Sequence, residues 1–207
     1  MDDRFWMRRA LALAEGGRYT AAPNPLVGCV LVRGGQLVGQ GFHRRAGEGH
    51  AEVLALAEAG PRAAGATAYV TLEPCAHHGR TPPCAQALIG AGVARVVAAM
   101  ADPNPRVAGQ GLAQLRAAGV AVDCGVLADQ AAALNPGFLK RMASGRPYVR
   151  VKMAQSLDGR SALADGAARW ITGPAARADV QRWRAPPAWA FTPYPTNSAR
   201  AGVTGWS

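Results

Sequence analysis

Two short segments of the chain carry side chains that could bind a metal ion and move protons. The first is the tripeptide His-Ala-Glu at 50–52, and the second runs from Pro74-Cys75 to Cys84. A catalytic zinc takes three protein ligands and leaves its fourth position open for water, and one imidazole with two thiolates meets this need. We therefore predict a zinc ion on His50, Cys75 and Cys84. Cys84 opens a predicted helix, whose N-terminus favours a thiolate.

Glu52 is the candidate proton carrier of this site. It lies two residues after His50, about 200° around an ideal helix, so we expect it to approach from another direction rather than bind the same ion. Zinc lowers the pKa of its bound water toward ~7. Glu52 could take that proton and return it to a ring nitrogen and a leaving amine. The order H-x-E, then P-C and a second Cys, is typical of zinc nucleobase deaminases, although eight residues separate the two cysteines here.

Other interpretations of these residues stay open. A structural zinc site usually has a fourth Cys or His ligand, and His77 and His78 are the candidates for it. Glu73 directly precedes the segment from Pro74 to Cys84, here called the metal loop, and could orient that loop or one of the ligands. Cys29 and Cys124 lie in apolar strand-like runs, where we expect small buried side chains.

Predicted helices and strands alternate around these segments. Apolar periodicity and Gly/Pro stop signals place the helices at 4–16, 50–59, 83–92, 109–119 and 128–145, the last interrupted near Asn135-Pro136. Strand-like runs lie at 26–32, 36–42, 66–72, 94–100 and 120–127, and a glycine turn joins the first two into a hairpin. We predict an α/β fold, a three-layer α/β/α sandwich with a mixed sheet.

Composition and charge narrow the function classes. The chain of 207 residues has 23 basic and 13 acidic side chains and a net charge of +10, but only Lys140 and Lys152 are lysines. No basic cluster alternates with aromatic residues, so we expect an anionic small molecule rather than nucleic acid as the partner. No apolar run approaches the ~20 residues of a membrane span, and no signal peptide is evident. Four scattered cysteines do not make a disulfide scaffold, and we expect a cytoplasmic protein.

Residues 1–184 resemble the bacterial bifunctional riboflavin-biosynthesis proteins, in which a pyrimidine deaminase is fused to a 5-amino-6-(5-phosphoribosylamino)uracil reductase. The motifs that carry the resemblance are PNPLVGCV (23–30), GFHRRAGEGHAE (41–52), TLEPCAHHGRTPPC (71–84), ADPNPRVAGQG (101–111), NPGFLKRM (135–142) and KMAQSLDGR (152–160). The resemblance implies a cytidine-deaminase-like fold and a hydrolase. Its substrate would be 2,5-diamino-6-(5-phosphoribosylamino)pyrimidin-4(3H)-one, which would lose its 2-amino group as ammonia.

The resemblance also implies roles for single residues. It makes Glu52 the general acid/base beside the three zinc ligands, and it lines the substrate pocket with Asn24, His43, Arg80 and Asn104. Asparagine side chains can donate to and accept from a pyrimidine edge, and an arginine suits a phosphate. Two of these residues have simpler interpretations. Asn24 lies between prolines, where it could be a turn residue, and His43 could be a strand-end histidine bonded to backbone.

The second half departs from the family pattern. Ala154, Trp170 and Arg184 match positions of cofactor or substrate contacts in a dihydrofolate-reductase-like domain that binds NADPH, whereas Ala168 stands where a polar contact is expected. After Arg184 the family pattern ends. We therefore expect NADPH only if the reductase domain were complete, and no reductase activity from this chain.

We predict three parts: a zinc-dependent deaminase domain at 1–144, an incomplete start of a reductase domain at 145–184, and an atypical tail at 185–207, disordered or from a shifted frame. The second part should begin with a strand and end in a helix. Two alternatives remain open. In the first, the chain is a multifunctional enzyme, both deaminase and NADPH-dependent oxidoreductase, and its reductase domain is completed by homo-oligomer formation. In the second, it is a non-catalytic remnant that exposes apolar surface.

Overall fold

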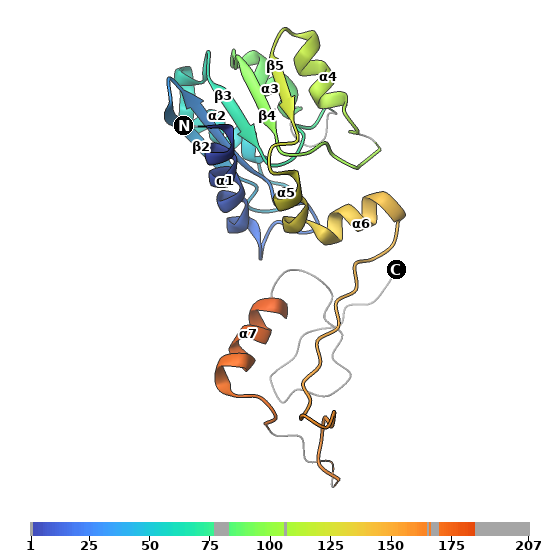
Figure 1. The fold of residues 1–207 in the computed structure, drawn as a ribbon. Coiled ribbons are helices and arrows are strands. Elements are labelled where there is room, and N and C mark those ends of the chain that lie inside the picture. The colour runs from blue at the N-terminus through green and yellow to red at the C-terminus, as the bar shows by residue number, and fades with distance from the viewer. Residues whose placement is uncertain (1, 77–82, 106, 165, 167–169, 185–207) are drawn as a thin grey trace.

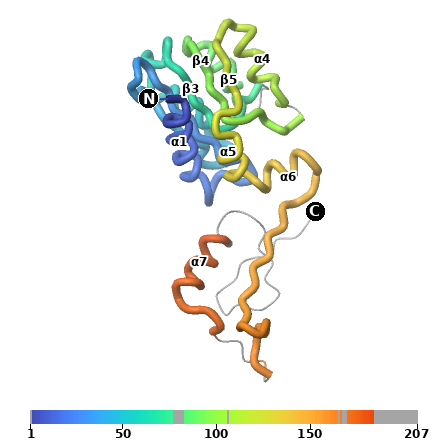
Figure 2. The backbone as a smooth tube through the Cα atoms, viewed as in Figure 1, coloured from blue at the N-terminus to red at the C-terminus, as the bar shows by residue number. Residues whose placement is uncertain are grey.

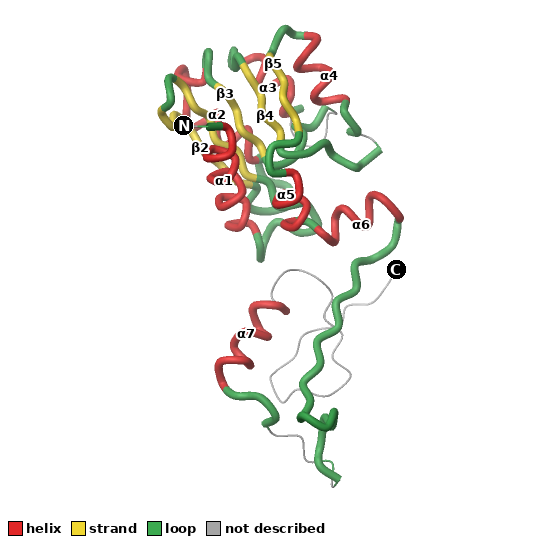
Figure 3. Tube along the Cα trace, viewed as in Figure 1, coloured by secondary structure: helices red, strands yellow, loops and turns green. Residues whose placement is uncertain are grey.

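The computed structural model describes residues 2–76, 83–105, 107–164, 166 and 170–184. The part before residue 145 is a five-stranded mixed sheet with helices on both faces (Figure 1; Figure 3). The strand order is β2-β1-β3-β4-β5. The β2–β1 and β1–β3 pairs are antiparallel, whereas the β3–β4 and β4–β5 pairs are parallel. The predicted three-layer α/β/α sandwich with a mixed sheet is confirmed.

A tight hairpin begins the sheet. β1 (Gly28–Arg33) and β2 (Gln36–Phe42) are joined by Gly34-Gly35. Both glycines have positive φ, +57° and +74°, and this backbone suits the two-residue turns whose twist matches that of the strands. The remaining strands, in sheet order, are β3 (Thr67–Val70), β4 (Arg95–Ala98) and β5 (Ala121–Cys124).

Helices cover both faces because successive residues of a strand point to opposite sides. On one face lie α1 (Asp3–Ala14) and α5 (Ala128–Leu134), and on the other α2 (Ala51–Ala59), α3 (Cys84–Gly90) and α4 (Gln110–Ala117). Within β1, Val30 packs in the cluster that contains Trp6 of α1, whereas Leu31 packs in the cluster that contains Leu88 of α3. The sheet therefore separates two apolar cores.

α2 approaches β2 closely because β2 has glycines on the facing side. A Cβ atom at Gly41 would lie 2.6 Å from the carbonyl oxygen of Ala51, and one at Gly39 would lie 2.3 Å from that of Ala55. Neither position has room for a side chain. The glycines thus seat the first turn of α2 on the sheet, and this fixes the position of His50, the residue before the helix.

The loops that carry the predicted site residues lie at the same end of the sheet, next to the ends of its strands. In the strand register, Gly28 at the start of β1 faces Phe42 at the end of β2. Val70, at the end of β3, faces Cys29 on one side and Ala98 at the end of β4 on the other. The loops next to these strand ends, which contain Asn24, His43, Cys75 and Asn104, therefore start close together.

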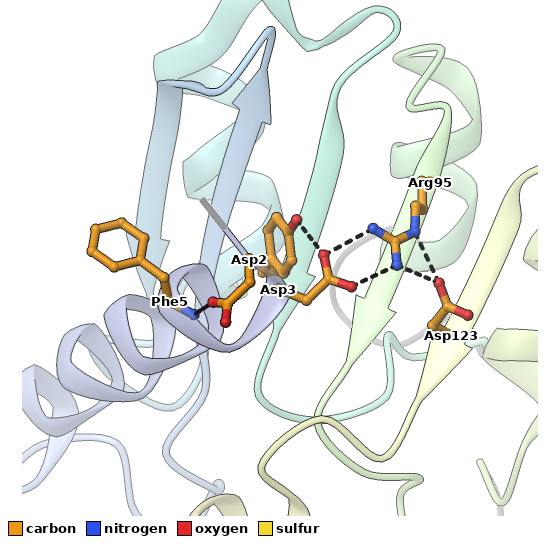
Figure 4. Close-up of polar contacts among 6 residues, drawn as sticks. Asp2, Asp3, Phe5, Arg95 and Asp123 are labelled. Carbon is orange, nitrogen blue, oxygen red and sulfur yellow. Dashed lines mark hydrogen bonds and ion pairs between the residues drawn. The ribbon is translucent and has the colours of Figure 1, made fainter.

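An ionic network ties α1 to the parallel strands (Figure 4). The guanidinium group of Arg95 donates to both carboxylate oxygens of Asp3 at 2.9 and 2.8 Å, and to Asp123 at 2.8 and 2.6 Å. The hydroxyl of Tyr69 also donates to Asp3, at 2.8 Å. One arginine thus connects the first turn of α1 with β4 and β5.

The structure also shows where the helix predicted at 128–145 is interrupted and how far Cys29 and Cys124 are buried. The expected interruption is confirmed, because α5 ends at Leu134 and α6 (Pro136–Ser144) begins after Asn135. The short 3-10 helices η1 (Glu15–Gly17) and η2 (Gly60–Ala63) follow α1 and α2. Cys29 is buried as expected, but Cys124 is exposed. The expectation for Cys124 was wrong because β5 is an edge strand, covered on fewer sides than a central one.

The segment after residue 144 leaves the α/β unit as an extended chain (Figure 2). The expected helix is present as α7 (Pro174–Arg184), but the described residues of 145–166 contain no strand. A strand needs a neighbour for its backbone N–H and C=O groups, and none pairs with this segment among the described residues. Val149, Val151 and Met153 are 73%, 77% and 72% exposed. The predicted tail at 185–207 lies outside the described residues, and none of the described helices could cross a bilayer.

Candidate metal centre and active site

Three side chains from different elements meet at this end of the sheet, where the loops leave the strands. His50 is the residue before α2, Cys75 lies in the loop after β3, and Cys84 is the first residue of α3. Their ligand atoms all lie within 4.8 Å of one another. Nδ1 of His50 is 3.1 Å from the sulfur of Cys84 and 3.6 Å from that of Cys75. The predicted metal ligands are therefore brought together.

These distances fit a zinc ion. Zn–N bonds of about 2.0–2.1 Å and Zn–S bonds of about 2.3 Å place tetrahedral N and S ligands about 3.5 Å apart, close to the observed separations. Within the described ranges no fourth His, Cys, Asp or Glu belongs to the cluster. His77 and His78 lie outside the described residues, so the interpretation as a four-ligand structural zinc site stays open.

The two sulfurs and the His50 imidazole shift one another's pKa values. A hydrogen bond from the Cys84 thiol, supported by His50, lowers the pKa of Cys75 to about 4. The neighbouring Cys75 sulfur raises the pKa of Cys84, and the bond to Cys75 raises that of His50. The backbone N–H of Cys84 also donates to the Cys75 sulfur, at 3.3 Å.

Glu52 is buried beside this cluster, with 3% of its surface exposed. Burial raises its pKa to about 7, which suits a group that must both accept and donate protons near neutral pH. Glu52 lies in the first turn of α2, whereas His50 has extended backbone outside the helix. The sequence argument from helical angles therefore does not apply, since only one of the two residues is helical.

Asn24 and His43 form a second pair at the same edge. The side-chain nitrogen of Asn24 lies 3.0 Å from Nε2 of His43, and Nδ1 of His43 lies 3.3 Å from the carbonyl oxygen of Gly49. A carbonyl only accepts, so Nδ1 carries the proton and Nε2 accepts from Asn24. The His43 ring packs edge-on against His50 at 5.4 Å, and burial lowers its pKa. His43 thus has the expected backbone contact as well as contacts to two site residues.

The other predicted contacts lie in the loop after β4, in the later segment or outside the described residues. Asn104 lies in the loop after β4 and its N–H donates to Asp102 at 2.8 Å, while Arg80 and Ala168 are among the residues that the structure does not describe. In the later segment Ala154 is half-buried, Trp170 is 70% exposed beneath the Arg177 guanidinium, and Arg184 ends α7.

Sequence reasoning missed how α4 supports the metal loop. The side-chain nitrogen of Gln114 lies 3.4 Å from the carbonyl oxygen of Ala76, next to Cys75. A Cβ at Gly111 would lie 1.9 Å from the carbonyl oxygen of Pro74. The sequence signal for this contact is Gly111, a glycine within a predicted helix, which indicates a close approach of another segment. It does not say which loop makes that approach.

Comparisons with known proteins match both parts of the chain. Residues 1–100 match the cytidine and deoxycytidylate deaminase zinc-binding region, and residues 147–188 match the RibD C-terminal domain. The riboflavin biosynthesis protein RibD of Escherichia coli is 62% identical over 185 residues, which are 89% of this chain and 50% of that protein. The chain thus spans about half the length of the curated relatives it matches.

Solved structures show the same fold. RibD of Acinetobacter baumannii superposes with a TM-score of 0.85 at 60% identity and covers 88% of this chain, which in turn covers 51% of that protein. A diaminohydroxyphosphoribosylaminopyrimidine deaminase/5-amino-6-(5-phosphoribosylamino)uracil reductase from Thermotoga maritima gives a TM-score of 0.83 at 39% identity, with coverage of 88% and 52%. The expected cytidine-deaminase-like α/β fold is confirmed.

Proposed function

We propose that the chain is a member of the RibD family of riboflavin-biosynthesis proteins and that it acts as a zinc-dependent pyrimidine deaminase. Its substrate is 2,5-diamino-6-(5-phosphoribosylamino)pyrimidin-4(3H)-one, and its products are 5-amino-6-(5-phosphoribosylamino)uracil and ammonia. The observation that carries the proposal is the convergence of His50, Cys75 and Cys84 within 4.8 Å beside the buried Glu52.

The residues of the site divide the work between them. His50, Cys75 and Cys84 would hold one zinc ion per chain, which supplies a Lewis acid that makes water nucleophilic near neutral pH. Glu52 accepts a proton from the attacking water and delivers protons to a ring nitrogen and to the amine. Water oxygen forms the new C=O bond while the C–N bond breaks, so ammonia leaves. Asn24, held by His43, and Asn104 hold the pyrimidine, and Arg80 pairs with its phosphate.

A reductase activity is the second candidate, favoured by the match of residues 147–188 to the RibD C-terminal domain. The described residues of this segment do not fit NADPH. Val149, Val151 and Met153 face solvent on an extended chain, and Trp170 is 70% exposed, whereas a cofactor site is a largely enclosed cleft. We derive no reduction step from them, and absence of reductase activity stays a prediction.

Ammonia release tests the proposed deaminase. The purified full chain, loaded with zinc and its zinc content measured, is incubated at pH 7 with the diaminopyrimidinone phosphate. We expect ammonia and the uracil product in equal amounts. A chain that holds one zinc and releases no ammonia would contradict the proposal. Adding NADPH and the uracil product to the same sample, and following absorbance of the reduced cofactor, tests the reductase alternative.

A further inference from the structure

Glu73 holds a whole loop through its carboxylate. The side chain is 4% exposed, and it accepts four backbone N–H groups. Oε2 accepts from Asp102 at 3.0 Å and Gly109 at 2.9 Å, and Oε1 accepts from Gly111 at 2.9 Å and Leu112 at 3.3 Å. Hydrogen bonds to a charged acceptor are the strong ones in proteins, so this carboxylate fixes both ends of the loop that follows β4.

Asn104 lies between the two ends that Glu73 holds. Its N–H donates to the Asp102 carboxylate at 2.8 Å, and its carbonyl accepts from Val107 at 2.8 Å and Ala108 at 3.0 Å. Glu73 thus holds Asp102, and Asp102 in turn holds Asn104. The path from the carboxylate to the proposed substrate contact is two hydrogen bonds long.

The loop has a strained residue that needs such support. Ala108 has φ of +29°, a left-handed backbone that favours glycine, and a non-glycine residue in such a region is strained. The next residue, Gly109, is one of the four that donate to Glu73. The carboxylate therefore stabilises a backbone that the loop sequence alone does not favour.

Glu73 also lies close in sequence to Cys75, so it connects the loop after β4 with the segment that carries a proposed metal ligand. Glu73 is two residues before Cys75, and its own backbone N–H donates to Met100 at 3.0 Å. Gly111 touches the carbonyl oxygen of Pro74, with no room for a Cβ. The metal loop and the loop that carries Asn104 are thus fastened together around one carboxylate.

We propose that Glu73 is a positioning residue for the deaminase, setting Asn104 at a fixed place relative to Cys75 without touching substrate itself. This inference rests on the proposed function for its consequence in catalysis. It places the effect of Glu73 on substrate binding through Asn104, rather than on proton transfer or on metal retention.

The test uses Glu73→Gln, which is nearly the same size but turns an NH₂ group toward backbone donors. Glu58→Gln is the matched control, because Glu58 accepts one N–H, from Gln40 at 3.3 Å, at an exposed position. We expect Glu73→Gln to raise KM by about 10–100-fold with zinc retained and a smaller change in kcat. Because the two residues act on one contact, Asn104→Ala should add little in the Glu73→Gln background. Multiplicative effects of the two substitutions would overturn the inference.

Hydrogen exchange gives a readout that needs no substrate. In the wild-type chain, we expect protected amides at 102, 109, 111 and 112, and in Glu73→Gln faster exchange at these four positions and unchanged exchange in the central strands. Unprotected amides in the wild type would overturn the inference even if the variant does not fold. If the wild type releases no ammonia, the proposed function fails, while exchange still decides whether Glu73 holds the loop.

Discussion

Asn135 holds the backbone of Leu26 from both sides. The N–H of Leu26 donates to Oδ1 of Asn135 at 2.7 Å, and Nδ2 of Asn135 donates to the carbonyl oxygen of Leu26 at 2.9 Å. The side chain imitates a strand neighbour for a residue 109 positions earlier in the chain. It thus anchors the loop that carries Asn24 to the break between α5 and α6.

Asn135→Ala should destabilise the α/β unit. The substitution removes two hydrogen bonds at a position with 9% exposure and leaves two backbone groups unpaired, so the free energy of unfolding should fall by about 1–3 kcal/mol. Urea unfolding followed by circular dichroism measures this. Gln130→Ala, an exposed position on α5, is the control and should stay within about 0.5 kcal/mol. Equal stability of the two variants would show that the Leu26 contact contributes nothing.

The alternation of helices and strands could be predicted because it depends on local patterns. Buried strands such as the one that contains residues 96–100 are continuous apolar runs, and Asn135-Pro136 stops a helix wherever it lies in the fold. The position of a strand within the sheet could not be predicted in this way. Cys124 follows an apolar run like Cys29, but β5 is at the edge and β1 is in the interior, so only one of the two cysteines is buried.

The candidate metal ligands could be picked out because few residue types bind zinc and all three occur in two short segments, and the structure brings these three side chains together. The supports could be predicted only in part: the place of Glu73 before Cys75 suggested an orienting role, but its partners are backbone groups that any residue supplies. Glu73 accepts N–H groups from residues 29 to 39 positions away, and His43 uses the carbonyl of Gly49. Such partners are determined by the folded path of the loops, not by side-chain identity.

Glu52→Gln should separate metal binding from catalysis. The amide is similar in size to the carboxyl group but cannot accept the proton of water, so we expect ammonia release to fall by about 10²–10⁴-fold while one zinc per chain is retained. Glu58→Gln, on the same helix, should leave both unchanged. Loss of zinc from Glu52→Gln would instead make Glu52 part of the metal site.

The Asp3–Arg95 pair should give the fold a weak acid sensitivity. The hydrogen bonds from Arg95 and, to a smaller extent, from Tyr69 lower the pKa of Asp3 from its ordinary 3.8. A lowered pKa stabilises the folded state above pH ~4, and this contribution is lost as the pH falls through the lower folded value. Since about a third of each side chain is exposed, Asp3→Asn should cost only about 0.5–1 kcal/mol at pH 7.

Unfolding of the wild type and Asp3→Asn at several pH values measures this contribution. The difference in unfolding free energy between them should be present at pH 7 and shrink below pH 4. It should also shrink in high salt, because partly exposed charges are screened. A difference that persists at pH 2 would assign the effect to lost packing of α1 rather than to the charge.

Zinc binding should weaken in acid and depend on only two of the four cysteines. In the metal-free chain the pKa values of His50 and Cys84 are raised, so zinc must displace protons, and its affinity should fall about tenfold per pH unit for each proton released. Competition with a chromogenic chelator between pH 6 and 8 measures the slope of zinc affinity against pH.

Cys84→Ala should lose the metal, whereas Cys124→Ala, at the exposed edge strand, should bind it as the wild type does. A slope of zero would mean that the ligands are already deprotonated without metal, and equal zinc binding by the two variants would remove Cys84 from the centre.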